Sequence, residues 1–427
     1  MRIGIFGGAF DPVHRKHVKI CESVLNEFNL DKLIVIPSYR PPHKRIEGGD
    51  NFSLRLEALK KAFADKPCIE ISSMEYAEKK HNYSYEIVQK IHESYPTDEL
   101  YFILGGDSLD KFSTWKYPEK ITALATLIAV ARPRYNTEDA AKKLKNEFGA
   151  RVLISLSEDD DVSSSYIRAL LELNDPEYID YIPMTAAEII SGGYTRYGDI
   201  TAFAEAQMSQ KLWEHTKRTV LTAVKENERI GLDPSKVFLS ALLHDVAKEI
   251  VFRKVGEASD RTTFRAADGM SEAEPKQIEY SKKTDIIEYY ARDLSEESKK
   301  KLAKYSKKLA IIEYSAPSDA VGSAVLHQFL SAEIAQQVLG IEDSEILDAI
   351  RFHTTAKPDM SELGMLIYLA DKIEPERDYE GVALIRAAIR EDLYRAYNVC
   401  LERGYKHLLS RSASIYPLTN DAYLSNR

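Results

Sequence analysis

The chain has 427 residues, long enough for two domains that each bury a core of their own. Its 58 basic and 67 acidic residues give a net charge of −9 with both signs interspersed, which argues against nucleic acid as a partner. Cys21, Cys68 and Cys400 are odd in number and far apart in sequence, which suits a reducing compartment better than a disulfide framework. No apolar run approaches the ~20 residues of a membrane span, so we expect a cytoplasmic protein without membrane contact.

The first 165 residues alternate short apolar runs with helical stretches. This alternation is typical of a parallel sheet with helices on both faces, an α/β fold. Strands are expected in six runs, namely Ile3 to Phe6, Leu33 to Pro37, Ile69 to Ser72, Leu100 to Leu104, Thr126 to Ala131 and Val152 to Ser155. Between the first two runs, Val18, Cys21, Leu25 and Phe28 fall at helical spacing, which predicts a crossover helix.

The alternation ends at a segment rich in glycine and tyrosine, residues 191–198. After Phe203 almost every stretch indicates helix, so we expect an α/β domain over residues 1–198 and an all-α domain over residues 199–427. Residues Phe252 to Ser318 are highly charged, and they are predicted to form a solvated helical insertion in the second domain.

A candidate phosphate site follows the first predicted strand. Gly7 and Gly8 would let the backbone approach a phosphate, and the free amides of the next helix would attract an anion. A Gly-Gly pair alone is weak evidence, because a plain tight turn uses it as well. His14 and His17 lie three apart, on one face of that helix, where both could donate hydrogen bonds to a polyphosphate. The histidine pair therefore favours the phosphate site.

Residues 7–17 resemble the G-x-F-D-P-x-H-x-G-H signature of nucleotidyltransferases with a Rossmann-like fold, specifically bacterial nicotinate-mononucleotide adenylyltransferases. Further segments match that family in order: Pro41-Pro42-His43-Lys44, Phe52-Ser53-Leu54-Arg55, Gly106-Asp107-Ser108-Leu109, Trp115-Lys116-Tyr117-Pro118 and Ser163-Ser164-Ser165-Tyr166-Ile167-Arg168. Two positions depart from the signature: Ala9 replaces threonine, and Lys16 replaces the glycine between the histidines. We expect the ammonium group of Lys16 to reach the phosphate site on its flexible stem.

The resemblance implies transfer of AMP from ATP to nicotinate mononucleotide, which gives deamido-NAD and pyrophosphate in NAD biosynthesis. Catalysis would rest on positioning and on charge stabilisation, with Mg2+ bound mainly by the phosphates of ATP. The residues implied at the ATP phosphates are His14, His17, Lys44 and Arg168. Those implied elsewhere in the nucleotide site are Gly7, Gly8, Ala9, Phe10, Asp107, Ser164 and Ser165, with Asp107 at the ribose. Tyr85 lies in the family's substrate loop, and Trp115 either stacks on the pyridine ring or anchors a surface loop.

In the second half, the pair His244-Asp245 follows an apolar run, Val237 to Leu243. The helix that carries this run is predicted to begin with Asp233 as its cap and Pro234 in its first turn. Asp371 ends another apolar stretch. A carboxylate in such a run is costly to bury unless a cation neutralises it, and a metal ion would do so.

In chain order, these residues and the remaining histidines resemble HD-domain metallohydrolases, most closely the bacterial YqeK-type diadenosine tetraphosphate hydrolases. The metal ligands that the resemblance implies are His215, His244, Asp245, His327, His353 and Asp371. Imidazole and carboxylate ligands suit a pair of transition ions, iron or manganese, which can activate a water and neutralise a phosphate. Lys248 would meet a phosphate of the substrate, which is expected to be cut symmetrically into two ADP. His407 lies outside the pattern, and we expect it to be a core histidine.

Each half has alternatives. The first could use another acceptor, such as phosphopantetheine, or it could be a nucleotide-sensing module that regulates the hydrolase because Lys16 prevents catalysis. The second could hydrolyse guanosine tetraphosphate or deoxynucleotides, or it could be a metal-free helical dimerisation domain. The sequence leaves open the identity of the metals, communication between the two sites and the oligomeric state, a homo-oligomer included.

Overall fold

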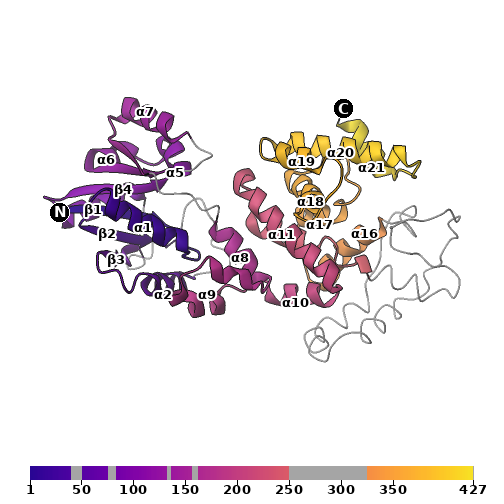
Figure 1. Cartoon of the computed structure of the whole chain (residues 1–427), viewed down its shortest axis with the longest axis horizontal. Helices are drawn as coiled ribbons and strands as arrows, with labels where there is room; N and C mark the ends of the chain where they lie inside the picture. The colour runs from indigo at the N-terminus through magenta and orange to yellow at the C-terminus, as the bar shows by residue number, and fades with distance from the viewer. Residues whose placement is uncertain (40–50, 76–82, 132–135, 156–161, 250–324, 427) are drawn as a thin grey trace. The chain divides into compact units, whose positions relative to one another are not determined.

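The structure is a computed structural model that describes residues 1–39, 51–75, 83–131, 136–155, 162–249 and 325–426 (Figure 1). Contacts between residues divide the chain into two compact units, Met1–Arg196 and Tyr197–Arg427. The charged segment 252–318, predicted to be a helical insertion, lies outside the described residues. Within the described part of the chain, none of the helices has the length and apolar character needed to cross a membrane.

The first unit is built on a sheet of six parallel strands, at the six places that the apolar runs predict. The strands are β1 (Arg2–Gly8), β2 (Lys32–Pro37), β3 (Ile69–Ile71), β4 (Glu99–Gly105), β5 (Ala125–Val130) and β6 (Val152–Ser155). Their order across the sheet is β3-β2-β1-β4-β5-β6, and every neighbouring pair is parallel. The order reverses between β1 and β4, and ligands of such sheets bind beyond the carboxyl ends of the strands at this switch point.

Helices cover both faces of the sheet, as predicted for an α/β fold. They are α1 (Arg15–Glu27), α2 (Phe52–Ala62), α4 (Ser84–Ser94), α5 (Gly106–Asp110), α6 (Pro118–Leu124), α7 (Thr137–Phe148), α8 (Ser164–Glu172) and α9 (Ala187–Gly193). Neighbouring strand residues face opposite cores: Val35 packs with Cys21 and Val24 of α1, whereas Ile34 packs with Val88 of α4. Burial on both faces explains why the strands are nearly continuous apolar runs.

Every regular element in the described part of the second unit is a helix. The helices are α10 (Gly198–Ala206), α11 (Gln210–Ile230), α12 (Pro234–Leu243), α16 (Leu326–Glu333), a π-helical turn (Ile334–Val338), α17 (Ser344–Arg351), α18 (Glu362–Ile373), α19 (Val382–Ile389), α20 (Leu393–Ser410) and α21 (Pro417–Ser425). Helix α18 packs against α11, α12, α17, α19 and α20, so it lies at the centre of the core.

The ends of the helices follow the local signals in the sequence. The side chain of Asp233 accepts hydrogen bonds from the backbone of Ser235 and Lys236, and Pro234 is the first residue of α12, as predicted. The expectation that His407 is a core histidine is wrong, because its side chain is exposed in the last turn of α20. A ring N–H donor is favourable near the carboxyl end of a helix, where the last backbone carbonyl groups lack partners within the helix.

Gly4 of β1 leaves no room for a side chain. A Cβ atom there would lie 2.6 Å from Cδ1 of Leu33 and 2.9 Å from Cδ1 of Leu30. We expect Gly4→Ala to lower the free energy of unfolding by about 1–3 kcal/mol, the usual cost of overpacking a core. The matched control is Gly192→Ala in α9, where a Cβ would meet nothing within 4 Å. Urea unfolding of the full chain measures both, and equal midpoints for the two variants would contradict the prediction.

Candidate functional site

The candidate nucleotide site lies at the switch point of the sheet. One loop leaves β1 after Gly8, and the first residue of α5, Gly106, directly follows the end of β4. Asp107 is the second residue of α5 and therefore lies at this edge of the sheet. A Cβ atom on Gly7 would meet nothing within 4 Å, whereas one on Gly8 would lie 3.2 Å from the ring of Phe10. The backbone at Gly7 is therefore open to a ligand.

His14 and His17 lie together, but not as two residues of one helix. His14 is the N-cap of α1 with an extended backbone, and its backbone N–H donates to Nδ1 of His17 at 3.2 Å. The two rings stack with 3.7 Å between their centroids, and His14 is only 4% exposed. Because Nδ1 of His17 accepts a hydrogen bond, the proton of the neutral ring belongs on Nε2, from which it can be donated to a phosphate.

The start of α8 is tied to the loop that follows β1. Ser163 is the N-cap of α8, and its hydroxyl accepts from the backbone N–H of Tyr166 at 3.1 Å. Ser164 donates to the carbonyl oxygen of Pro12, also at 3.1 Å. The guanidinium of Arg168 donates to the carbonyl oxygen of Asp11 and, at 3.1 Å, to the hydroxyl of Ser165. These bonds bring three predicted nucleotide-site residues, Ser164, Ser165 and Arg168, to the loop that leads into His14.

A buried arginine supports the same loop, and the sequence-based site did not include it. Arg55 of α2 has no exposed surface, and its Nη1 donates to the carbonyl oxygen of Ala9 at 2.6 Å. Its Nε donates to Oδ1 of Asn51 at 2.8 Å, and Nδ2 of Asn51 donates to Oδ1 of Asp11 at 2.7 Å. Arg55 belongs to the quoted Phe52-Ser53-Leu54-Arg55 segment, so that motif held the signal.

The two predicted acceptor-site residues pack against the core on the α4 face of the sheet. The Tyr85 ring meets the Tyr117 ring edge to face at 5.1 Å between centroids. The half-buried Trp115 ring contacts Phe112 at 5.1 Å and Phe102 at 6.2 Å. Trp115 is therefore anchored to the core, and its stacking on a pyridine ring stays a prediction. Lys44, predicted at the ATP phosphates, lies outside the described residues.

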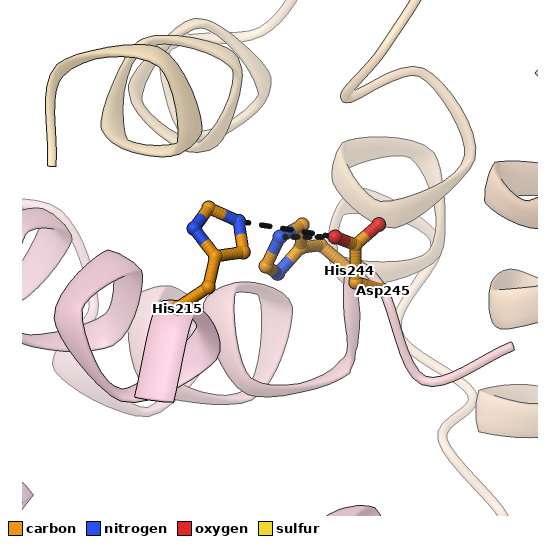
Figure 2. Close-up of side chains that lie close together, drawn as sticks. All are labelled: His215, His244 and Asp245. Carbon is orange, nitrogen blue, oxygen red and sulfur yellow. Dashed lines mark ion pairs between the residues drawn. The ribbon is translucent and has the colours of Figure 1, made fainter. Parts of the chain in front are cut away.

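The candidate metal centre forms around Asp245, whose side chain is fully buried. One carboxylate oxygen, Oδ2, lies 3.4 Å from Nε2 of His244 and 3.8 Å from Nε2 of His215. Figure 2 shows these two rings turned toward the Asp245 carboxylate. The other oxygen, Oδ1, lies 3.2 Å from Nε2 of His327 and 3.3 Å from Nε2 of His353. Two groups that could each hold a metal ion therefore share Asp245.

The remaining predicted residues of the metal centre lie in the same cluster. Oδ1 of Asp371, on α18, is 3.1 Å from Nε2 of His215. Nζ of Lys248 is 2.6 Å from Oδ2 of Asp245. The fold thus brings together all six predicted ligands and Lys248, although they span residues 215–371 of the chain.

The charges of the cluster compensate one another. Burial disfavours the charge of Asp245, but His244 and Lys248 outweigh burial and hold the pKa of its carboxyl well below the usual range. Burial likewise opposes the charge of Lys248, yet Asp245 raises the pKa of its ammonium group. Burial lowers the pKa of His353 to about 4, so this imidazole is neutral at pH 7, the form that binds a metal.

Three of the histidine rings are oriented by a contact at Nδ1, the ring nitrogen that points away from Asp245. His244 and His353 each contact, through Nδ1, the carbonyl oxygen three residues earlier, at 2.7 and 2.8 Å. Nδ1 of His215 instead contacts Oε1 of Glu374 at 3.2 Å. Because carbonyl and carboxylate oxygens only accept, Nδ1 of each of these rings carries a proton, which leaves Nε2 as the atom that a metal ion would bind.

The residues fit a pair of transition-metal ions. Nε2 of His244 and Oδ1 of Asp245 are buried without a hydrogen-bond partner among the described residues, which is costly unless an ion satisfies them. Imidazole and carboxylate ligands suit divalent transition metals. Sequence reasoning missed Glu374, Arg377 and Thr354: Arg377 Nη2 donates to Oδ1 of Asp371 at 2.7 Å, and the Thr354 hydroxyl lies 3.0 Å from Nε2 of His353. Thr354 directly follows His353, and Glu374 and Arg377 follow Asp371 by three and six residues, so closeness in sequence to a predicted ligand was the available signal.

Comparisons with known proteins separate the same two halves. A cytidylyltransferase-like family matches residues 5–170, and the HD domain matches residues 212–314, which include His215, His244 and Asp245. A Mycoplasma genitalium protein named probable nicotinate-nucleotide adenylyltransferase/Ap4A hydrolase is 25% identical over 408 residues, which are 94% of this chain and 97% of that protein.

A second relative has a higher sequence identity but matches only the first half of this chain. A probable nicotinate-nucleotide adenylyltransferase of Citrifermentans bemidjiense is 35% identical over 185 residues, which are 39% of this chain and 86% of that protein. With the switch-point loop and the histidine pair in place, this similarity shows that the chain belongs, through its first unit, to the nicotinate-nucleotide adenylyltransferase family and carries an HD domain after it.

Proposed function

We propose that the chain is a bifunctional enzyme. Residues 1–198 transfer AMP from ATP to nicotinate mononucleotide, and residues 199–427 hydrolyse diadenosine tetraphosphate (Ap4A) into two ADP. Family membership supports the first activity, and the Mycoplasma relative, named for both activities, matches 94% of this chain. The observation that carries the second activity is the Asp245 carboxylate, each oxygen of which faces a pair of imidazole nitrogens.

In the transfer, an oxygen of the mononucleotide phosphate attacks the α-phosphorus of ATP, and pyrophosphate leaves. His14 and His17, at the start of α1, donate hydrogen bonds to the phosphates, and Arg168 and Lys44 add positive charge. Ser164 and Ser165 offer hydroxyl and backbone donors at the start of α8. Gly7, Gly8, Ala9 and Phe10 bring the backbone close to ATP, Asp107 binds its ribose, and Mg2+ arrives bound to its phosphates. Tyr85 and Trp115 hold the pyridine ring.

In the hydrolysis, the six-residue cluster holds two divalent transition ions, iron or manganese. When bound, these ions supply an activated water and positive charge next to the phosphate. Lys248 and Arg377 end in cations at the cluster, 2.6 Å from Asp245 and 2.7 Å from Asp371 respectively, and they orient the polyphosphate by charge. Burial of His244, His327 and His353 keeps bulk water away from the ligand atoms.

His17→Ala tests the transfer site. It removes one preorganised donor to the phosphates, so adenylyl transfer should fall on the order of 10²-fold or more, whereas hydrolysis should be unchanged. The measurement is formation of deamido-NAD and pyrophosphate from ATP and nicotinate mononucleotide, with Ap4A hydrolysis by the same preparation as the folding control. Transfer within a few-fold of wild type would remove His17 from the mechanism, and a wild type that binds ATP without turnover would favour a nucleotide-sensing module.

Asp371→Ala tests the metal centre. It should lower the content of bound iron or manganese, measured by elemental analysis, and abolish hydrolysis without affecting adenylyl transfer. Alanine is the better helix former, so α18 should still form, and helix content by circular dichroism checks that the second unit is folded. The matched control is Asp378→Ala, which truncates an exposed aspartate seven residues later and should keep both metal and activity. Full metal content in Asp371→Ala would contradict its role as a ligand.

The products of Ap4A cleavage test the position of attack. Attack by water at one of the two central phosphorus atoms, with ADP as the leaving group, gives two ADP, and chromatography of early time points should show ADP alone. ATP plus AMP would refute symmetrical cleavage. A wild type that cleaves guanosine tetraphosphate but not Ap4A would assign the site to another nucleotide.

A further inference from the structure

Among the histidines of the metal centre, His215 is oriented by a charged group. His244 and His353 contact backbone carbonyl oxygens through Nδ1, whereas Nδ1 of His215 contacts Oε1 of Glu374 at 3.2 Å. Glu374 is the residue that ends α18, and it is only 2% exposed. A buried carboxylate behind an imidazole both fixes the ring and makes the opposite nitrogen a stronger ligand.

The other oxygen of Glu374 is held by two donors. Oε2 accepts from Nε of Arg218 at 2.7 Å and from the backbone N–H of Glu376 at 2.9 Å. Arg218 lies on α11, three residues after His215, so both residues face α18 from one side of the helix. With Oε2 occupied in this way, the carboxylate cannot rotate without losing both bonds, and Oε1 stays directed at His215.

We propose that Glu374 is a positioning residue for the metal centre: it holds the proton of His215 on Nδ1 and so presents the Nε2 lone pair to the metal. Nε2 of His215 is the atom that lies 3.1 Å from Asp371 and 3.8 Å from Asp245. The inference rests on the proposed metal centre but does not depend on which phosphate ester the enzyme cleaves.

A glutamine at this position distinguishes positioning from simple packing. In Glu374→Gln, the two donors at the Oε2 position would pair with the amide oxygen, and the amide NH2 would then face His215. An NH2 group cannot accept a hydrogen bond, so Nδ1 of His215 would have to accept and the proton would move to Nε2. The variant keeps the shape of the side chain but presents an N–H, instead of a lone pair, to the metal.

The experiment compares the full-length wild type, Glu374→Gln and Glu376→Gln. The control, Glu376, is 70% exposed and meets the same Arg218 through Nη2 at 2.9 Å. Each protein is loaded with Mn2+, and release to a chelator is measured. Glu374→Gln should bind Mn2+ about 10–100-fold more weakly than wild type, the usual effect of losing such a partner. Glu376→Gln should match wild type.

The second readout is the bonding of His215 in the full chain loaded with diamagnetic Zn2+, from 15N NMR of histidine-labelled protein. Wild type should show a protonated Nδ1 and a metal-bound Nε2, whereas Glu374→Gln should show a protonated Nε2 that is not bound to the metal, a change that loss of packing would not produce. Equal Mn2+ release and an unchanged tautomer in Glu374→Gln would overturn the inference. If Glu374→Gln does not fold, Glu374→Asp should keep the Nδ1 proton but release Mn2+ faster, and wild-type release would overturn the inference instead.

The outcomes also separate this inference from the proposed function. A wild type that binds no Mn2+ refutes the metal centre, and with it the role of Glu374. A wild type that binds Mn2+ and cleaves Ap4A, alongside a Glu374→Gln variant that does both equally well, refutes the role of Glu374 alone.

Discussion

The second unit is organised by one buried charge, the carboxylate of Asp245. An ionised carboxylate in an apolar interior is tolerated only where opposite charge or ligands surround it. Asp245 has no exposed surface, and its two oxygens face imidazoles that come from four separate places in the chain. The packing of α11, α12, α16 and α17 therefore has to converge on this residue. This requirement explains why His215 and His327 are buried in α11 and α16, and why His244 and His353 are buried just beyond the ends of α12 and α17.

In the first unit, the buried charge is a cation, the guanidinium group of Arg55. Arg55 is fully buried, and the carbonyl oxygen of Ala9 and the amide oxygen of Asn51 accept its hydrogen bonds. A carbonyl directed inward at an arginine leaves the neighbouring loop backbone free to face a ligand. In a phosphate-binding loop, the carbonyl oxygens need partners within the protein, because the backbone N–H groups must stay available to the phosphate. The arginine thus stabilises the loop from its buried side.

The sequence predicts what depends on local periodicity, and less of what depends on packing between helices. The six strands are found where apolar runs predict them, and the Asp233 cap follows from a local signal. Glu374 was missed because a charged residue next to a helix end normally indicates solvent, and Arg218 because a charged residue inside an amphipathic helix normally lies on its exposed face. Their burial arises from the packing of α18 on α11, which single-sequence patterns do not contain. His14 was expected within a helix but caps it, since helix boundaries are the least certain part of a periodic pattern.

Both candidate sites lie at helix ends. The site in the first unit lies at amino ends, and the site in the second unit lies at carboxyl ends. In the first unit, His14 and Ser163 are the N-caps of α1 and α8, and unpaired N–H groups at such ends favour an anion such as polyphosphate. In the second unit, His244 directly follows α12 and His353 lies two residues beyond the end of α17, each close to carbonyl groups of the last helical turn. These carbonyl oxygens accept from the imidazoles, and the negative end of the dipole favours a cation. The same backbone asymmetry thus suits one unit to a nucleotide and the other to a metal ion.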